Sequence, residues 1–595
     1  MKKILLISII SLHLLVSCKN NETILKKDIN SEKSDNIIKK NSVIDETIYG
    51  FLPDDSVNNT TEDSITTKKS YKNGEIKLNY LTTVGHLVTL DPNNSKPNAK
   101  MFYVAFTAEK KPSQKRPVTF IYDGGPGTTS MYQLLGGFSP KVIKSSYPNF
   151  TPPGGYSLED NPDSLLEKTD LIYINAIGTA YSTAIAPFKN RNFWGADEDA
   201  QSFVNFIKRY LTKNKRWDSP KFLMGLSYGT VRSPILVYFL HKNGIDFNGI
   251  TSISTILDYR NWMNPIGQLP SFSAAALNYQ KIQINDTNNV FDHLKKVEDF
   301  SSNEYASFMD GWNDNYKNLN NLIYHNTDTI LQSLLNEKIK IAKNYHNLIE
   351  LLKLSSPAEI ELANKIETAL SKMSEMPDRI ANKVEKYIGI NSLDIKKQTK
   401  FDLNILPLNL FNFLPSHLLE NENKFISFYD ARNSRFSNPI VDNIDYLFQD
   451  PLMNNTNSVF NAAWFLYIQK ELKYSTNSNF IPQNMYLIDL WNYSHTYPSG
   501  KETKLQGDLY VGEDLAAALN LNPNLKFFQA GGIYDFITPY YQATLDLKNL
   551  PLVNEVKANI EIHNYSSGHL MFLDLNTRAK MKKDLEKFYE KAIYR

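Results

Sequence analysis

Short, almost fully apolar runs recur in the first half of the chain, and each leads into a loop that contains glycine. Residues 118–122, 171–174 and 222–224 follow this pattern, and residues 196–211 between them have the periodicity of an amphipathic helix. Runs of this kind are typical of parallel strands that are buried on both faces. The alternation of strands and helices predicts an α/β protein with a mostly parallel sheet and helices on both faces.

Other patterns extend this predicted core on both sides. Residues 75–80 and 101–106 alternate apolar and polar side chains, which predicts antiparallel strands joined through a turn-rich segment. Sheet character returns near the end of the chain, at residues 485–490 and 525–529. Residues 578–593 then have the pattern of a closing helix. The α/β core is therefore expected to be built from two separate stretches of sequence.

Between these stretches the pattern changes to long runs of Leu, Ile, Lys, Glu and Asn at helical spacing. Ser356 and Glu359 have the spacing of a capping box. We predict that residues 71–258 and 484–595 form the core and that residues 259–483 are an inserted helical cap. Such a cap would cover the carboxyl ends of the strands, where active sites of parallel sheets form. A coiled-coil or partner-binding role of the Lys-rich helices remains the alternative.

The first residues combine a charged start with an apolar middle. Lys2 and Lys3 precede an apolar run over residues 4–16, which is too short to span a bilayer and is typical of a secretory signal. The run ends at Cys18, the single cysteine of the chain, in a sequence that resembles a bacterial lipobox. We predict that residues 1–17 are a lipoprotein signal peptide. Acyl chains on Cys18 would anchor the exported protein to a membrane of a bacterial envelope.

Composition adds two expectations. Residues 18–70 are rich in Lys, Asn, Asp, Glu, Ser and Thr and poor in aromatic residues, which predicts a disordered tether. The 65 basic and 63 acidic residues nearly balance. Since no basic stripe with interleaved aromatic residues appears, nucleic acid is not expected as a partner. The sequence does not indicate the oligomeric state.

One motif points to nucleophilic catalysis. Residues 225–229 read Gly-Leu-Ser-Tyr-Gly and fit the pattern G-x-S-x-G, with an apolar strand before them and a helical pattern after them. The glycines leave room for a sharp strand-to-helix turn that exposes the hydroxyl of Ser227. We therefore predict that Ser227 is a nucleophile.

A serine hydroxyl needs an adjacent base, which an acid orients. In α/β-hydrolases the three residues follow in the order Ser, Asp or Glu, His. His569 follows the apparent strand at residues 559–565, whereas His563 lies inside that strand, where a structural role is expected. Asp535 lies in the loop after the preceding strand. The predicted triad is Ser227, Asp535 and His569.

The oxyanion of an acyl transfer needs two preorganised N–H donors. We expect one from Tyr228, directly after the nucleophile, and the other from the Gly124-Gly125-Pro126-Gly127 loop. Gly125 is the preferred donor, because glycines allow close approach of the backbone to the carbonyl group.

With these motifs the chain resembles the serine carboxypeptidase family (peptidase family S10), especially its bacterial lipoprotein branch, from about residue 71 to the end. The resemblance implies an α/β-hydrolase core with an inserted helical cap. It also implies hydrolysis of peptides through an acyl-enzyme, with no metal or other cofactor. The strings that carry the resemblance are residues 123–127, 178–182, 193–200, 225–230, 534–535 and 568–569.

Three positions depart from the family pattern. Well-known members hold the C-terminal carboxylate of the substrate with the Asn of an N-G-G-P-G loop, a downstream Glu and the Glu of G-E-S-Y-G. Here these positions hold Asp123, Gly137 and Leu226. An ionised Asp123 would repel a carboxylate and could instead hold an ammonium group.

Two further residues are expected near the substrate. Gly124 precedes the predicted oxyanion donor. Arg232 offers a guanidinium that suits a carboxylate, although an ion pair with the cap or with the acidic cluster at residues 197–199 is an equal alternative. We therefore name Asp123, Gly124, Leu226 and Arg232 as candidate substrate-binding residues.

The sequence thus predicts a membrane-tethered peptidase of the serine carboxypeptidase type that acts on peptides. The same triad would also serve an aminopeptidase, an esterase or an acyltransferase. The altered carboxylate site keeps open an inactive surface lipoprotein that only binds its ligand.

Overall fold

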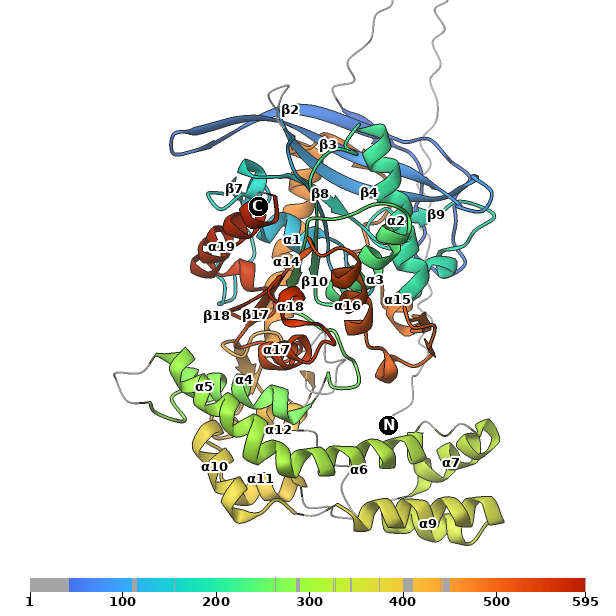
Figure 1. Ribbon diagram of the computed structural model, residues 1–595, viewed down its shortest axis with the longest axis vertical. Helices are drawn as coiled ribbons and strands as arrows, with labels where there is room; N and C mark the ends of the chain where they lie inside the picture. The colour runs from blue at the N-terminus through green and yellow to red at the C-terminus, as the bar shows by residue number, and fades with distance from the viewer. Residues whose placement is uncertain are drawn as a thin grey trace, which may run out of the picture.

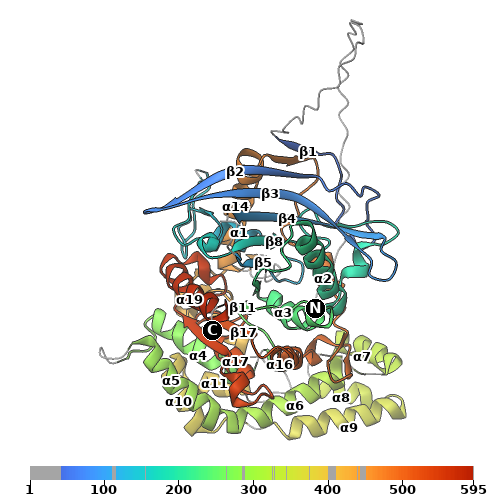
Figure 2. The same ribbon diagram turned by 45° about the horizontal axis from the view of Figure 1, so that its top comes forward.

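The structure is a computed structural model in which a twisted central sheet carries helices on both faces, and a helical layer lies at one end of it (Figures 1 and 2). The predicted α/β architecture is confirmed. The described residues are 42–593, apart from 110–114, 155, 263, 285–288, 325, 327, 343–344, 374, 400–409, 439 and 442–449. Among these residues, no helix is both long and apolar enough to cross a membrane.

In the described part of the chain, the central sheet has ten strands. Its main path runs β18-β17-β11-β10-β5-β8-β4-β3-β2, and β9 (Thr183–Ala184) pairs beside β4. The strands from β18 to β8 are parallel, and β8, β4, β3 and β2 are antiparallel neighbours. The bounds are β2 Ser64–Asn73, β3 Ile76–Leu90, β4 Pro97–Ala108, β5 Val118–Tyr122, β8 Asp170–Ile174, β10 Lys221–Leu226, β11 Gly249–Ile253, β17 Lys526–Gly532 and β18 Ile560–Tyr565.

The inner parallel strands β5, β8, β10 and β11 are mainly apolar and buried, because both faces of the sheet are covered there. In β5, Phe120 and Tyr122 enter one hydrophobic core, and Ile121 between them enters the other. Full burial of a side chain of this size stabilises the fold by about 1.5–3 kcal/mol. One face packs against α2 (Ala196–Lys213), α3 (Tyr228–Lys242) and α16 (Gly512–Leu521). The other packs against α1 (Met131–Gly136), α14 (Pro451–Leu466) and α19 (Leu575–Ile593).

A third core belongs to the helical layer, coloured green to yellow in Figure 1. It also takes in Ile533, Tyr534 and Phe536, which follow β17, so the layer packs directly on a loop of the sheet. The predicted capping box is present, since the Ser356 N–H donates to Glu359 Oε2 at 3.1 Å. The helices are α4 Pro265–Asn278, α5 Val290–Phe300, α6 Ala306–Tyr324, α7 Thr329–Ile341, α8 Tyr345–Lys353, α9 Pro357–Ser371, α10 Asp378–Ile388, α11 Ser392–Thr399 and α12 Leu410–His417.

The segment predicted as a tether is structured over residues 42–70, so that part of the prediction is wrong. β1 (Val43–Asp45) pairs in parallel with β14 (Tyr474–Thr476), and β2 forms the edge of the central sheet. The carboxylate of buried Asp45 accepts hydrogen bonds from the hydroxyls of Tyr49 and Tyr474, both at 2.6 Å. The polar composition was misleading because an edge strand exposes every second side chain. The predicted signal peptide and Cys18 lie outside the described residues.

The end of the predicted cap also needs correction. α14 and β14 fall within residues 259–483, yet they pack with α1 on the face of the central sheet. Residues 485–490 were predicted as strand, but residues Met485–Asp489 form the helix α15. The Asn484 side chain accepts a hydrogen bond from the Leu487 N–H at 3.3 Å and thereby caps this short helix. An apolar run of this length does not distinguish a strand from a helix.

Candidate active site

Ser227 lies at the sharp turn between β10 and α3. Its backbone has φ 55° and ψ −123°, a conformation that costs on the order of 1–3 kcal/mol for a residue other than glycine. The flanking glycines permit the turn, because a Cβ on Gly225 would come within 2.3 Å of the Gly229 carbonyl oxygen. The Ser227 N–H donates to the Ile253 carbonyl oxygen at 3.0 Å, which ties the turn to β11. Ser227 is thus presented at the carboxyl end of a central strand.

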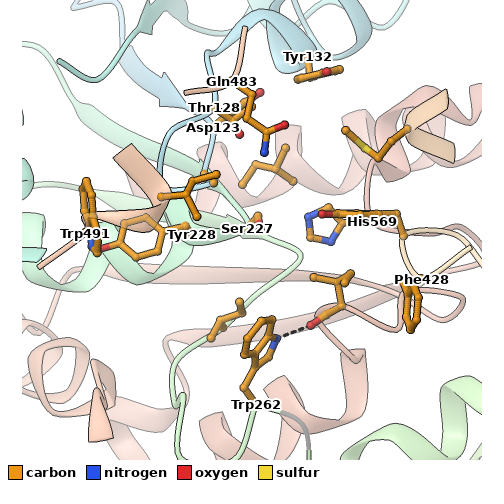
Figure 3. A pocket seen from close by; sticks show the side chains of 18 of the residues that line it. Asp123, Thr128, Tyr132, Ser227, Tyr228, Trp262, Phe428, Gln483, Trp491 and His569 are labelled. Atoms are coloured by element: carbon orange, nitrogen blue, oxygen red, sulfur yellow. Dashed lines mark hydrogen bonds between the residues drawn. The ribbon is translucent and has the colours of Figure 1, made fainter. Parts of the chain in front are cut away.

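His569 and Asp535 come from the loops after β18 and β17. The His569 Nδ1 atom lies 2.8 Å from Asp535 Oδ2, and Asp535 is fully buried. The Thr538 N–H donates to Asp535 Oδ1 at 2.9 Å, and its hydroxyl donates to Oδ2. The contact between Nδ1 and Asp535 turns the other ring nitrogen, Nε2, away from the acid. The imidazole lies beside Ser227 in the same cavity (Figure 3).

The cavity has a volume of about 810 Å³, is mainly apolar, and is lined by Ser227. Aromatic side chains make up much of its wall (Figure 3). Its carboxyl groups belong to Asp123 and to Asp489, and none of the described lining residues is Lys or Arg. The lining residues include Tyr132, Tyr228, Tyr259, Trp262, Phe428, Tyr429, Met453, Trp491 and Tyr493.

The glycine loop after β5 lies directly against the turn that carries Ser227. A Cβ on Gly124 would lie 2.4 Å from the Tyr228 nitrogen. Gly125 has φ +106°, and a Cβ there would lie 2.3 Å from the Gly127 nitrogen. The Tyr228 N–H is the first of α3 and has no acceptor within the helix. Both predicted oxyanion donors therefore line the cavity next to the serine.

Asp123 is 3 % exposed and also lines the cavity. Gln133 Nε2 donates to its Oδ1 at 2.6 Å, whereas its Oδ2 makes no hydrogen bond within the described part of the chain. Burial raises the pKa of Asp123 to about 7, although the Gln133 hydrogen bonds and the charge of Arg232 act in the opposite direction. The carboxyl group therefore changes its protonation state near neutral pH.

Arg232 does not line the cavity, so its predicted role in substrate binding is wrong. Its Nε donates to Asp199 Oδ2 at 2.5 Å, and its Nη1 donates to the Asp123 carbonyl oxygen at 2.8 Å. The guanidinium is 1 % exposed and lies over the ring of Phe203. The position of Arg232 on α3 directs it toward α2, and the alternative of an ion pair with the acidic cluster is confirmed. Leu226, in contrast, lines the cavity.

His563 and Gly137 both make structural contacts, and a structural role of His563 was expected from its place inside a strand. His563 stacks on Phe528 with ring centroids 4.3 Å apart, and its Nε2 lies 3.2 Å from Glu561 Oε2. Gly137, which stands where the family has a carboxylate, ends α1 and donates its N–H to the Gln133 carbonyl oxygen at 2.9 Å. Neither residue lines the cavity.

The helical insertion also contributes residues to the cavity, and these were not predicted from the sequence. Phe428 and Tyr429 line the cavity beside His569. The Tyr429 carbonyl oxygen accepts a hydrogen bond from the backbone N–H of His569 at 2.6 Å. Trp262, at the start of the insertion, forms another part of the wall. No motif marks these positions, since only the path of the folded chain brings them to the predicted triad. Among the described residues, no cluster of His, Cys, Asp or Glu side chains has the geometry of a metal site.

Comparison with known proteins identifies relatives of this chain. A serine carboxypeptidase of Caenorhabditis elegans is 28% identical over 147 residues, which are 24% of this chain and 26% of that protein. A pheromone-processing carboxypeptidase of Phytophthora infestans is 31% identical over 121 residues, or 20% of this chain and 18% of that protein. The chain thus matches about a quarter or less of the length of these relatives.

The crystal structure of a prohormone-processing carboxypeptidase from Saccharomyces cerevisiae has a TM-score of 0.45 and 13% sequence identity to this chain. The alignment covers 91% of this chain and 94% of the yeast chain. The family model of the serine carboxypeptidases, peptidase family S10, matches residues 76–402, more than half of the sequence. The resemblance to the family is confirmed, whereas its bacterial lipoprotein branch stays a prediction, and this chain belongs to the serine carboxypeptidase family.

Proposed function

We propose that the protein hydrolyses peptides through an acyl-enzyme formed on Ser227. The observation that carries this proposal is the convergence of a strained serine turn with a buried His569–Asp535 pair in one cavity. Family membership supports peptidase chemistry. The aromatic walls of the cavity suit the side chains of a peptide substrate.

His569 acts as the base in this mechanism. Its Nε2 accepts the proton of the Ser227 hydroxyl as the oxygen attacks the substrate carbonyl carbon, and it returns this proton to the leaving amine. Asp535 accepts the Nδ1–H hydrogen bond and stabilises the imidazolium. Water then attacks the acyl-enzyme by the same proton path and releases the second product.

Backbone N–H groups stabilise the oxyanion of the tetrahedral intermediate. The Tyr228 N–H stands at the N-terminus of α3, where the helix dipole favours negative charge. Gly125 supplies the second donor from the loop that packs on the serine turn. Loss of one such donor typically costs about 10²–10³ in kcat.

Carboxypeptidase action requires a partner for the C-terminal carboxylate of the substrate. The neutral form of Asp123 can donate its O–H to that carboxylate, because its buried Oδ2 is not engaged elsewhere in the described part of the chain. This interaction would replace the carboxylate contacts that the family pattern assigns to Asn and Glu.

Aminopeptidase action is the second candidate. The cavity is lined by the carboxyl groups of Asp123 and Asp489 and by no described Lys or Arg, which favours a substrate ammonium group once Asp123 is ionised. The two candidates therefore differ in the protonation state of Asp123 that binds substrate.

The test uses peptides that are blocked at one end only, incubated at pH 6 and pH 8, with products identified by mass spectrometry. Stepwise loss of residues from a free C-terminus, faster at pH 6, supports the carboxypeptidase. Cleavage only of peptides with a free N-terminus, faster at pH 8, would replace it with the aminopeptidase. The Ser227→Ala variant should be inactive in both cases.

A fluorophosphonate probe separates the enzyme from an inactive binding protein. Labelling of the wild type and not of Ser227→Ala would establish a reactive serine. Labelling without cleavage of either peptide would reject the peptidase in favour of an esterase or an acyltransferase. Absence of labelling would indicate a binding lipoprotein.

We also propose that the protein is exported and anchored in a bacterial envelope through lipid on Cys18. The proposal rests on the lipobox-like sequence alone. Radiolabelled palmitate should be incorporated covalently into the wild-type protein but not into the Cys18→Ala variant. Equal labelling of both would contradict it.

A further inference from the structure

A short segment of the helical insertion lies across both loops that carry the proposed acid and base. This segment, here called the strap, comprises residues 427–433 between β12 (Lys424–Ile426) and β13 (Ser434–Phe436). The buried Asp450 carboxylate anchors its start, accepting hydrogen bonds from the Ser427 hydroxyl and the Phe428 N–H, both at 2.8 Å. These hydrogen bonds fix the conformation at the start of the strap.

The strap contacts the histidine loop through its backbone. The Tyr429 carbonyl oxygen accepts the His569 N–H at 2.6 Å, and the Tyr429 ring meets the imidazole edge to face with centroids 5.2 Å apart. Gly568 permits this approach, because a Cβ there would lie 2.4 Å from the Asp430 Cβ. Phe428 lies on the same side of the cavity as His569 (Figure 3).

The strap also forms hydrogen bonds with the two residues that flank Asp535 in the sequence. The Ala431 N–H donates to the Tyr534 carbonyl oxygen, and the Phe536 N–H donates to the Phe428 carbonyl oxygen, each at 2.9 Å. These bonds lie on the two sides of Asp535 in the sequence. The strap thus hydrogen-bonds to both loops whose relative position sets the His569–Asp535 contact.

Arg432 joins the strap to the histidine loop and to the core. Its Nη2 donates to Ser567 Oγ at 3.1 Å, and its Nη1 donates to the Ser566 carbonyl oxygen at 3.2 Å. The same Nη1 lies 3.0 Å from Asp574 Oδ2, at the start of α19. Within the strap, Nη2 lies 2.8 Å from the fully buried Asp430 carboxylate. The planar guanidinium can make these contacts at once, which a lysine cannot.

We propose that the strap is a positioning element of the active site, and that Arg432 is the positioning residue through which the insertion holds His569 in line with Ser227. The proposal rests on the assignment of Ser227, Asp535 and His569 in the proposed function. Arg432 does not line the cavity and so acts through the histidine loop, not through substrate.

The test compares Arg432→Gln with the wild type in two assays: hydrolysis of the peptide, blocked at one end only, that the wild type cleaves, and the rate at which a fluorophosphonate labels Ser227. We expect kcat to fall at least tenfold, KM to change less than twofold, and the labelling rate to fall by the same factor as kcat. Arg432→Lys, which keeps the charge but not the fork of donors, should recover part of the loss. A merely structural role would not produce this division between kcat and KM.

Arg435→Gln is the matched control. Arg435 lies on β13, donates to the Phe436 carbonyl oxygen at 3.0 Å and lies over the Phe425 ring. It should keep wild-type kcat. The proposal is wrong if the kcat of Arg435→Gln falls as much as that of Arg432→Gln. It is also wrong if folded Arg432→Gln keeps the wild-type kcat and labelling rate.

Asp574→Asn decides the question if Arg432→Gln does not fold. It weakens the contact of Arg432 with the core, while Asn can still accept the Thr577 N–H hydrogen bond that Asp574 Oδ1 now accepts. We expect a smaller fall in kcat and labelling rate, at least threefold, and unchanged rates would overturn the proposal. If the wild type labels but cleaves no peptide, the peptidase assignment fails while the labelling rates still test the strap.

Discussion

Replacing Asp123 with Asn should change how the stability of the protein depends on pH. Asp123 is 3 % exposed, and burial raises its pKa from 3.8 to about 7. Between these two values the native state binds more protons than the unfolded state, so the free energy of unfolding falls as the pH rises. A difference of about three pKa units corresponds to about 4 kcal/mol. Asn cannot ionise and escapes this loss.

The assay is urea denaturation of the wild type and Asp123→Asn at intervals from pH 4 to pH 8. The variant should gain stability relative to the wild type across this range, by about 4 kcal/mol in total, and the gain should level off above pH 7. Asp218→Asn, at an exposed position, serves as the control for the loss of one carboxyl group. A difference in the free energy of unfolding between the wild type and Asp123→Asn that does not change with pH would refute the argument. It would mean that Asp123 has the same pKa in the native and the unfolded state.

Two further predictions concern the serine turn and a buried histidine. Gly124→Ala should lower kcat at least a hundredfold in a folded protein, because its Cβ would lie 2.4 Å from the Tyr228 nitrogen and displace the oxyanion donor; wild-type turnover would contradict this. His495 is buried, which lowers its pKa, but its contacts with Asp197 and Asp514 raise the pKa to about 9. The stability that this shift contributes is present below pH 6.5 and is lost as the pH rises through about 9. The free energy of unfolding of His495→Gln should therefore be about 3 kcal/mol lower than that of the wild type at pH 6, and the difference should be much smaller at pH 9.5. Urea denaturation measures both differences, and equal values at the two pH values would contradict a stabilising role of the ion pairs.

The parts of this protein that could be predicted from sequence are those that local patterns encode. The strand at residues 118–122 was predicted with its observed bounds, since a parallel strand covered on both faces gives a short, almost fully apolar run in the sequence. The turn at Ser227 was predictable because only flanking glycines permit it. The order of the triad along the chain then narrowed the acid and base to Asp535 and His569, which the structure brings together at 2.8 Å.

Other features depend on contacts between residues far apart in the sequence. Residues 42–70 have the composition of a tether, yet β1 pairs with β14, which lies more than 400 residues later. Arg232 had two interpretations of equal standing, and the packing of α3 against α2 selected the ion pair with Asp199. A residue's face on a helix can be predicted from the sequence, but the helix that will cover that face cannot.

By itself, the sequence determined the alternation of strands and helices, the serine turn and the candidates for the triad, because these follow from side-chain periodicity and from the backbone freedom of glycine. Only the tertiary structure decided the burial of Asp123, the aromatic walls of the cavity and the course of the strap over the loops that carry Asp535 and His569. The physical reason is that burial, and with it a pKa, depends on every group that surrounds a side chain. Those groups come from segments that approach one another only in the folded chain.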